Sequence, residues 1–149
     1  MDTTSLLSAI EPDELSVFAP SLSGWKRGIF HNVDQVAEFM VQGGAQSPTA
    51  SATGGPAGPD PRPDRKYWDF VKQEMHVFLC KDDKRYKDLW KSIDALQKKS
   101  TTAIVGLIAA YLGGLISAPA TLLAGFVAVC LYGMLKIGKE AYCQQAAQR

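Results

Sequence analysis

The sequence predicts an all-α membrane protein in which a cytoplasmic helical pair is followed by a two-helix transmembrane hairpin. None of the 31 charged residues falls within the 36 residues of 100–135, whereas basic side chains flank that stretch on both sides. The preceding segment, 65–99, repeats its apolar residues at three- and four-residue spacing, which is typical of amphipathic helices. A flexible linker, 43–64, connects these parts to a small acidic N-terminal helical unit, 1–42.

The N-terminal unit, 1–42, carries six acidic residues against two basic ones, for a net charge of −4. We expect one helix over 12–18 and another over 33–41, the second begun by Asn32 as its N-cap. The apolar stripe of the second helix is Val33, Val36, Phe39 and Met40. A unit this small is unstable alone. We therefore expect it to fold against the helical pair, a second copy or a cytoplasmic protein partner.

The linker, 43–64, contains five of the eight prolines and five of the thirteen glycines, and it has no large apolar side chain. This composition favours a flexible to semi-extended chain. The alternative is a phosphate-binding loop around Gly54, Gly55 and Gly58. No strand pattern precedes those glycines and no Lys-Ser/Thr pair follows them, so the linker interpretation is favoured.

The segment 65–99 is predicted to form two helices separated by the charged sequence KDDK at 81–84. Asp64 is the expected N-cap of the first helix, and Asp82 or Asp83 that of the second. The first stripe is Tyr67, Trp68, Val71, Met75, Phe78 and Leu79, and the second is Tyr86, Leu89, Trp90, Ile93 and Leu96. The opposite face carries mixed charges, which indicates a solvated surface. Alternatively, the basic residues of this segment attract anionic lipid headgroups, and Lys98 and Lys99 are the best placed to do so.

The apolar segment, 100–139, contains an uncharged run, 100–135, that is too long for one membrane-spanning helix. A 36-residue helix would measure about 54 Å, against about 30 Å for a bilayer core. Pro119 offers a natural break and predicts a hairpin turn. The arms 103–117 and 120–137 would then reach about 22 Å and about 27 Å. Both are slightly short for a bilayer, so we expect local thinning or lysine snorkelling.

Basic residues at the outer ends of the hairpin predict its orientation. Lys98 and Lys99 precede the first arm, Lys136 and Lys139 follow the second, and the turn between the arms is uncharged. This pattern places both ends, including the tail 140–149, on the cytoplasmic side of the cell (inner) membrane. The lipid bilayer is thus the first expected partner.

Small residues recur every four positions along both arms, as is typical of closely packed helices in lipid. They are Gly106, Ala110, Gly114 and Ala118 on the first arm and Ala120, Ala124 and Ala128 on the second. Two uses remain open, arm against arm and subunit against subunit. The second use implies a homo-oligomer.

Three tyrosines have expected roles at the membrane. Tyr111 lies near mid-depth of the first arm, where its hydroxyl needs a partner such as a carbonyl or Thr121. Packing between helices is favoured for Tyr111 over lining a water-filled path. Tyr132 and Tyr142 are better placed as anchors at the membrane interface.

A buried hairpin inside a soluble protein is the alternative interpretation of the apolar stretch. Arms of this length lie near the boundary between core helices and membrane spans. The remaining polar chain is judged too small to cover two helices that are apolar on every side, so a soluble form would require an oligomer.

The sequence contains no catalytic motif, and we expect neither an enzyme nor a cofactor. Cys80, Cys130 and Cys143 show no CxxC spacing, and no secretory signal is seen, so free thiols in a reducing cytoplasm are expected. His76 and Cys80 stand four residues apart and would need His31 and Cys143 to complete a metal site. Ordinary buried residues are favoured over such a site, and no nucleic-acid partner is expected from the charge layout.

Two functions from different classes follow from this layout, which resembles that of small two-span membrane effectors of bacterial defence and toxin systems. The first is an oligomeric pore-forming or membrane-disrupting effector controlled through its cytoplasmic part. The second is a membrane-anchored adaptor that recruits a cytoplasmic partner through the N-terminal unit 1–42 on its linker.

Overall fold

The computed structural model describes residues 2–42, 65–81 and 83–147, and this part of the chain is helical and contains no strand. The predicted linker 43–64 and the predicted cap Asp64 lie outside the described residues. The elements are α1 (Thr3–Ala9), α2 (Pro12–Phe18), α3 (Leu22–Lys26), α4 (Val33–Val41), α6 (Arg65–Cys80), η1 (Lys84–Tyr86), α7 (Lys87–Asp94), α8 (Thr101–Ile116), α9 (Ala120–Ile137) and α10 (Lys139–Ala147).

The expected helices form where the apolar spacing predicted them. Helix α4 begins at the predicted cap, since the Asn32 side chain accepts a hydrogen bond from the Gln35 amide at 2.8 Å. Asp83 caps the second helix of the pair through the Arg85 amide, and that helix starts with a 3-10 turn, η1. The stripe predicted for α4 is wrong at Phe39, which is 42% exposed and packs on Phe30.

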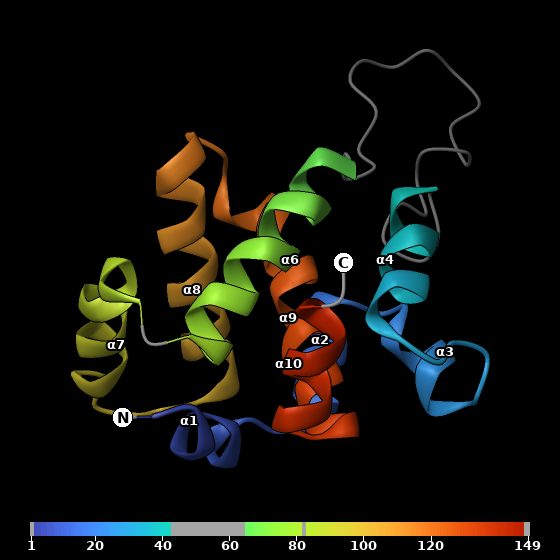
Figure 1. Ribbon diagram of the computed structural model, residues 1–149, viewed down its shortest axis with the longest axis horizontal. Helices are drawn as coiled ribbons and strands as arrows, with labels where there is room; N and C mark the ends of the chain where they lie inside the picture. The colour runs from blue at the N-terminus through green and yellow to red at the C-terminus, as the bar shows by residue number, and fades with distance from the viewer. Residues whose placement is uncertain (1, 43–64, 82, 148–149) are drawn as a thin grey trace.

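Helix α9 occupies the centre of the molecule (Figure 1). It contacts α2, α4, α6, α8 and α10, which together surround it. Every residue from Gly125 to Met134 is buried, so the helix is covered on all sides over that length. The polar part of this short chain is thus large enough to cover the C-terminal half of α9, contrary to the sequence-based estimate.

The N-terminal helices fold against the rest of the same chain. The ring of Trp25 in α3 meets Tyr132 of α9 edge-on, with centroids 5.2 Å apart. The Thr3 hydroxyl donates to the Leu79 carbonyl at 3.0 Å, and the Glu11 amide donates to the Thr101 hydroxyl at 2.7 Å. These contacts close the bundle around α9.

Helices α6 and α7 cover the other sides of the hairpin. Trp68 of α6 stacks near Phe126 of α9 at 5.4 Å. Phe78 of α6 packs on Trp90 of α7 at 4.5 Å, and on Tyr86 at 5.3 Å. The buried Tyr86 hydroxyl donates to Glu74. Burial of the ring raises the pKa of this phenol, and the hydrogen bond to Glu74 raises it further.

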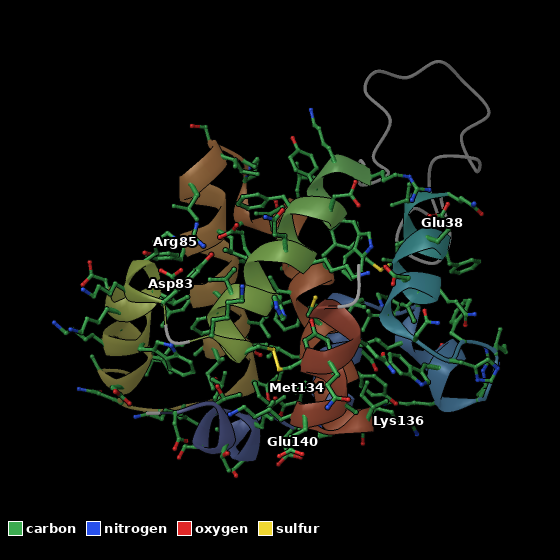
Figure 2. All side chains as sticks on the ribbon, in the orientation of Figure 1. Glu38, Asp83, Arg85, Met134, Lys136 and Glu140 are labelled. Atoms are coloured by element: carbon green, nitrogen blue, oxygen red, sulfur yellow. A yellow bond between two sulfur atoms is a disulfide. The ribbon has the colours of Figure 1, made fainter. Side chains whose placement is uncertain are left out.

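The C-terminal helix α10 returns along the molecule and is covalently joined to α6. Gly138, with a φ of +93°, turns the chain between α9 and α10. Cys80 at the end of α6 and Cys143 in α10 form a disulfide, visible as the yellow bond in Figure 2. The expectation of free thiols is therefore wrong for these two cysteines. Cys130, buried in α9, is free.

The predicted fold class is confirmed as all-helical, and the apolar stretch does form two helices that break at Pro119. Within the described residues, only α9 is long and apolar enough to cross a membrane. Helix α8 is apolar but has 16 residues. A two-span hairpin therefore stays a prediction.

Candidate functional site

The turn between α8 and α9 is a compact helix–helix connection. Ser117 adopts a left-handed conformation, with φ of +56°, and the Ala118 amide donates to the Gly113 carbonyl at 2.9 Å. A Cβ added to Gly113 would lie 2.4 Å from the Ala118 carbonyl oxygen, so only glycine fits there. Pro119 follows in extended conformation and starts α9. The turn is thus built by Gly113 and Ser117 as well as by the predicted Pro119.

The tip of the hairpin exposes apolar side chains and no charge. Leu115, Ile116 and Leu122 are 54%, 37% and 36% exposed. Pro119 and Thr121 are exposed beside them. Large apolar residues at an uncharged surface are the groups that a lipid phase takes up most readily.

The small residues of α8 lie on its outer face. Gly106, Ala110 and Gly114 are exposed, and a Cβ added to either glycine would meet no atom within 4 Å. The buried face of α8 instead includes larger residues, namely Ile104, Val105, Ile108 and Leu112, and α8 contacts α2, α7 and α9. These three positions therefore take no part in an arm-against-arm contact in this structure.

The small residues of the turn and of α9 are less exposed. Ala118, Ala120 and Ala124 are half-buried, and Ala128 is buried. Gly133, also buried, has the closest contact, since an added Cβ would lie 2.4 Å from a methyl of Val33. This part of the predicted packing pattern lies within the bundle of one chain.

Tyr111 and Thr121, the polar residues considered for contacts within the hairpin, have different surroundings in the structure. The Tyr111 hydroxyl donates to the Arg85 carbonyl at 2.6 Å, and its ring packs on Tyr86 at 5.6 Å. Its partner is therefore a carbonyl, one of the two kinds expected, and this contact ties α8 to η1. Thr121 is exposed at the tip.

The basic residues at the base of the hairpin are largely available to solvent. Lys98, Lys136 and Lys139 are exposed. The Lys99 ammonium donates to the carbonyls of Asp94 and Leu96, each at 3.1 Å, and so caps the end of α7. Three of the four lysines are thus exposed to solvent.

The two tyrosines expected at the membrane interface are buried in this closed form. Tyr132 is 5% exposed and packs on Trp25. Tyr142 is 3% exposed, and its buried hydroxyl interacts with the Cys130 thiol. Burial raises the pKa of the Tyr142 phenol well above its usual value. Both rings would reach an interface only after the bundle opens.

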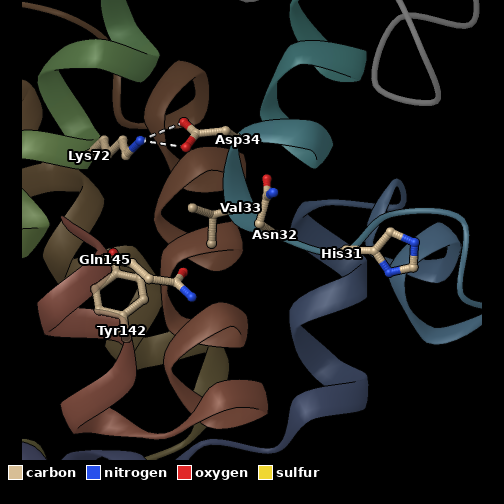
Figure 3. Close-up of a pocket in the computed structure, with 7 residues that line it drawn as sticks. All are labelled: His31, Asn32, Val33, Asp34, Lys72, Tyr142 and Gln145. Carbon is tan, nitrogen blue, oxygen red and sulfur yellow. Dashed lines mark hydrogen bonds and ion pairs between the residues drawn. The ribbon is translucent and has the colours of Figure 1, made fainter. Parts of the chain in front are cut away.

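A pocket of about 220 Å³ lies where α4, α6 and α10 meet (Figure 3). The buried Lys72 ammonium pairs with both carboxylate oxygens of Asp34 at 2.6 Å, and Trp68 donates to the same carboxylate at 3.2 Å. Tyr142 forms the opposite side, next to Gln145 and Val33. The Asp34–Lys72 ion pair beside the pocket links α4 to α6.

Sequence analysis missed the disulfide and the Asp34–Lys72 pair. Their partners are separated by 63 and 38 residues, and no local spacing brings them together. The metal site considered for His31, His76, Cys80 and Cys143 is not formed, because Cys80 and Cys143 are bonded to one another. In the described ranges, His, Cys, Asp and Glu form no cluster of three suited to a metal.

Comparisons of the chain with protein-family models, with curated proteins and with solved structures find no match. The function is therefore inferred from the residues and their geometry.

Proposed function

We propose that the protein is a membrane-disrupting or pore-forming effector whose α8–α9 hairpin passes from the closed bundle into a lipid bilayer. The observation that carries this proposal is the uncharged hairpin, 100–135, with Leu115, Ile116 and Leu122 exposed at its tip. In this proposal the other helices cover α9 until it is released.

The hairpin meets the physical requirements for entering lipid. Each Lys, Arg or Asp at the centre of a span would cost about 3 kcal/mol on insertion scales, and residues 100–135 of the hairpin include none of them. Its backbone groups are bonded within two helices, and the Ser100 side chain caps α8 through the Ala103 amide at 3.1 Å. Entry tip-first would leave the basic base, with Lys98 and Lys136, in the cytoplasmic headgroups of the inner membrane.

Self-association is the second part of the proposal, because two helices cannot enclose a water path. The outer face of α8, with Gly106, Ala110 and Gly114, offers close approach to α8 of another copy. The wall of such a pore would consist of serine, threonine, tyrosine and small residues. It would therefore open by wetting rather than by titration of a charged side chain.

Release of an entrapped dye from vesicles tests this function. The purified full chain is expected to empty vesicles of mixed anionic and zwitterionic lipid. Gly114→Leu should abolish release, since it fills the contact face of α8 where the closed bundle has no atom within 4 Å. Ser92→Leu adds the same exposed bulk on α7, outside the hairpin, and should leave release intact. Vesicles that stay tight with the unaltered chain in both its oxidised and its reduced form would refute the proposal.

The alternative of a membrane-anchored adaptor is favoured by one surface feature. Ile29 and Phe39 are 59% and 42% exposed, and with Phe30 they line a shallow depression on the N-terminal helices. Such a depression suits an apolar side chain of a protein partner. Vesicles that stay tight, together with a co-purifying partner that Phe39→Asp releases, would favour the adaptor.

A further inference from the structure

The Cys80–Cys143 disulfide closes a loop that contains the whole hairpin. The two cysteines are 63 residues apart, and α7, α8 and α9 all lie between them. Cys80 ends α6, and Cys143 lies in α10, the helix that follows α9. The bond therefore links an element before the hairpin to one after it, with the two Cα atoms 5.7 Å apart.

The two joined helices are among the five that surround α9. Helix α10 turns back at Gly138 and contacts both α6 and α9. Helix α6 places Trp68 against Phe126 in the middle of α9. Because every residue from Gly125 to Met134 is buried, this half of α9 cannot reach lipid until the helices around it move apart. The disulfide ties two of those helices, α6 and α10, to one another.

We propose that the Cys80–Cys143 pair is a redox modification site that controls release of the hairpin, an inference that rests on the proposed membrane function. The disulfide holds the closed bundle. Reduction by a dithiol, a small molecule or the dithiol of a redox protein, allows α6 and α10 to part and α9 to leave.

The exchange balances without a further reactant. A thiolate of the dithiol attacks one sulfur of the pair and forms a mixed disulfide, while the other cysteine leaves as a thiolate and takes up a proton. The second thiol of the reductant then displaces the first cysteine, which also ends as a thiol. Two electrons and two protons thus pass to the protein, and the reductant departs as a disulfide.

The three cysteines differ in their exposure to solvent, so reagents reach the disulfide before they reach Cys130. Cys80 and Cys143 are both half-buried and so reachable from solvent. Cys130, the free cysteine of α9, is 0% exposed in the closed bundle. Cys130 is therefore protected from reagents until α9 is uncovered, and it reports on the opening of the bundle.

The first experiment measures opening in water, without lipid. The rate at which a maleimide labels Cys130 is compared between the oxidised chain and the Cys80→Ser/Cys143→Ser variant, in which Cys130 is the remaining thiol. We expect labelling at least tenfold faster in the variant, with the helical circular dichroism retained. The reduced unaltered chain should become slow again after re-oxidation, which separates opening from misfolding. Equal rates in all forms would overturn the proposal.

The second experiment keeps the two proposals distinguishable. Dye release from vesicles is measured for the oxidised chain, the reduced chain and the double serine variant. We expect release to rise at least tenfold on reduction and to be insensitive to reductant in the variant. Equal release from the oxidised and reduced chains would overturn redox control and leave the membrane function standing. No release from any form would refute the membrane function, and Cys130 labelling would then decide on redox opening.

Discussion

Loss of the Cys80–Cys143 disulfide should lower the free energy of unfolding by about 4 kcal/mol. The cross-link spans a sequence separation of 63 residues, and in the chain-entropy account it removes the freedom of that loop from the unfolded state. A loop of this length corresponds to about 4 kcal/mol at 25 °C. With a urea dependence of about 2 kcal/mol per molar, the unfolding midpoint should fall by about 2 M.

Urea unfolding followed by circular dichroism measures this difference. The oxidised chain is compared with the Cys80→Ser/Cys143→Ser variant at the same concentration and pH. Adding reductant should shift the unaltered chain to the midpoint of the variant and should leave the variant unchanged. A shared midpoint before reduction, or three reactive thiols in the native oxidised chain, would refute the reasoning.

Three further predictions test the packing and the buried polar contacts of the bundle, and each is checked by urea unfolding. Gly114→Ala should stabilise the closed bundle by about 1 kcal/mol, because alanine has a higher helix propensity than glycine at this exposed position of α8. Gly133→Ala should destabilise the bundle by about 2 kcal/mol, because the added methyl group would collide with Val33. Stability changes of the same sign for the two variants would contradict this prediction. Asp34→Asn should lower the free energy of unfolding by about 2 kcal/mol, since it leaves the buried Lys72 ammonium without its charged partner. Lys72→Met should lower it by less, because methionine leaves no unpaired buried charge. A larger loss for Lys72→Met than for Asp34→Asn would contradict this account of the ion pair. Burial raises the pKa of Tyr86, so this phenol stays neutral in the folded chain, whereas it ionises near pH 10 in the unfolded chain. The free energy of unfolding should therefore fall as the pH rises above 10. An equally steep fall in a Tyr86→Phe variant would show that Tyr86 is not the cause.

Local periodicity in the sequence was sufficient to predict several helices and their ends. The Asn32 cap, the break at Pro119 and the two helices of 65–99 depend on residues a few positions apart, and the structure has each of them. The sequence also showed that α9 would be apolar. It did not show that α9 would be buried in the protein, because an apolar helix has the same composition in lipid and in a protein core.

Tertiary contacts between distant residues could not be predicted from spacing. Phe39 shares the period of its buried neighbours yet lies on the edge of the stripe, where no helix covers it. Gly114 and Gly133 belong to similar small-residue patterns, but one faces solvent and the other contacts Val33. The cysteine count allowed a pair, although nothing in the local sequence selects Cys80 and Cys143 as partners.

The positions of the tryptophans give the protein an intrinsic optical signal for its own rearrangement. Trp25 and Trp68 both contact α9, through Tyr132 and Phe126, whereas Trp90 packs on Phe78 of α6. Departure of α9 would hydrate the first two indoles and shift their emission to longer wavelength. A Trp90→Phe chain would therefore let the kinetics of hairpin departure be followed in stopped flow without any attached dye.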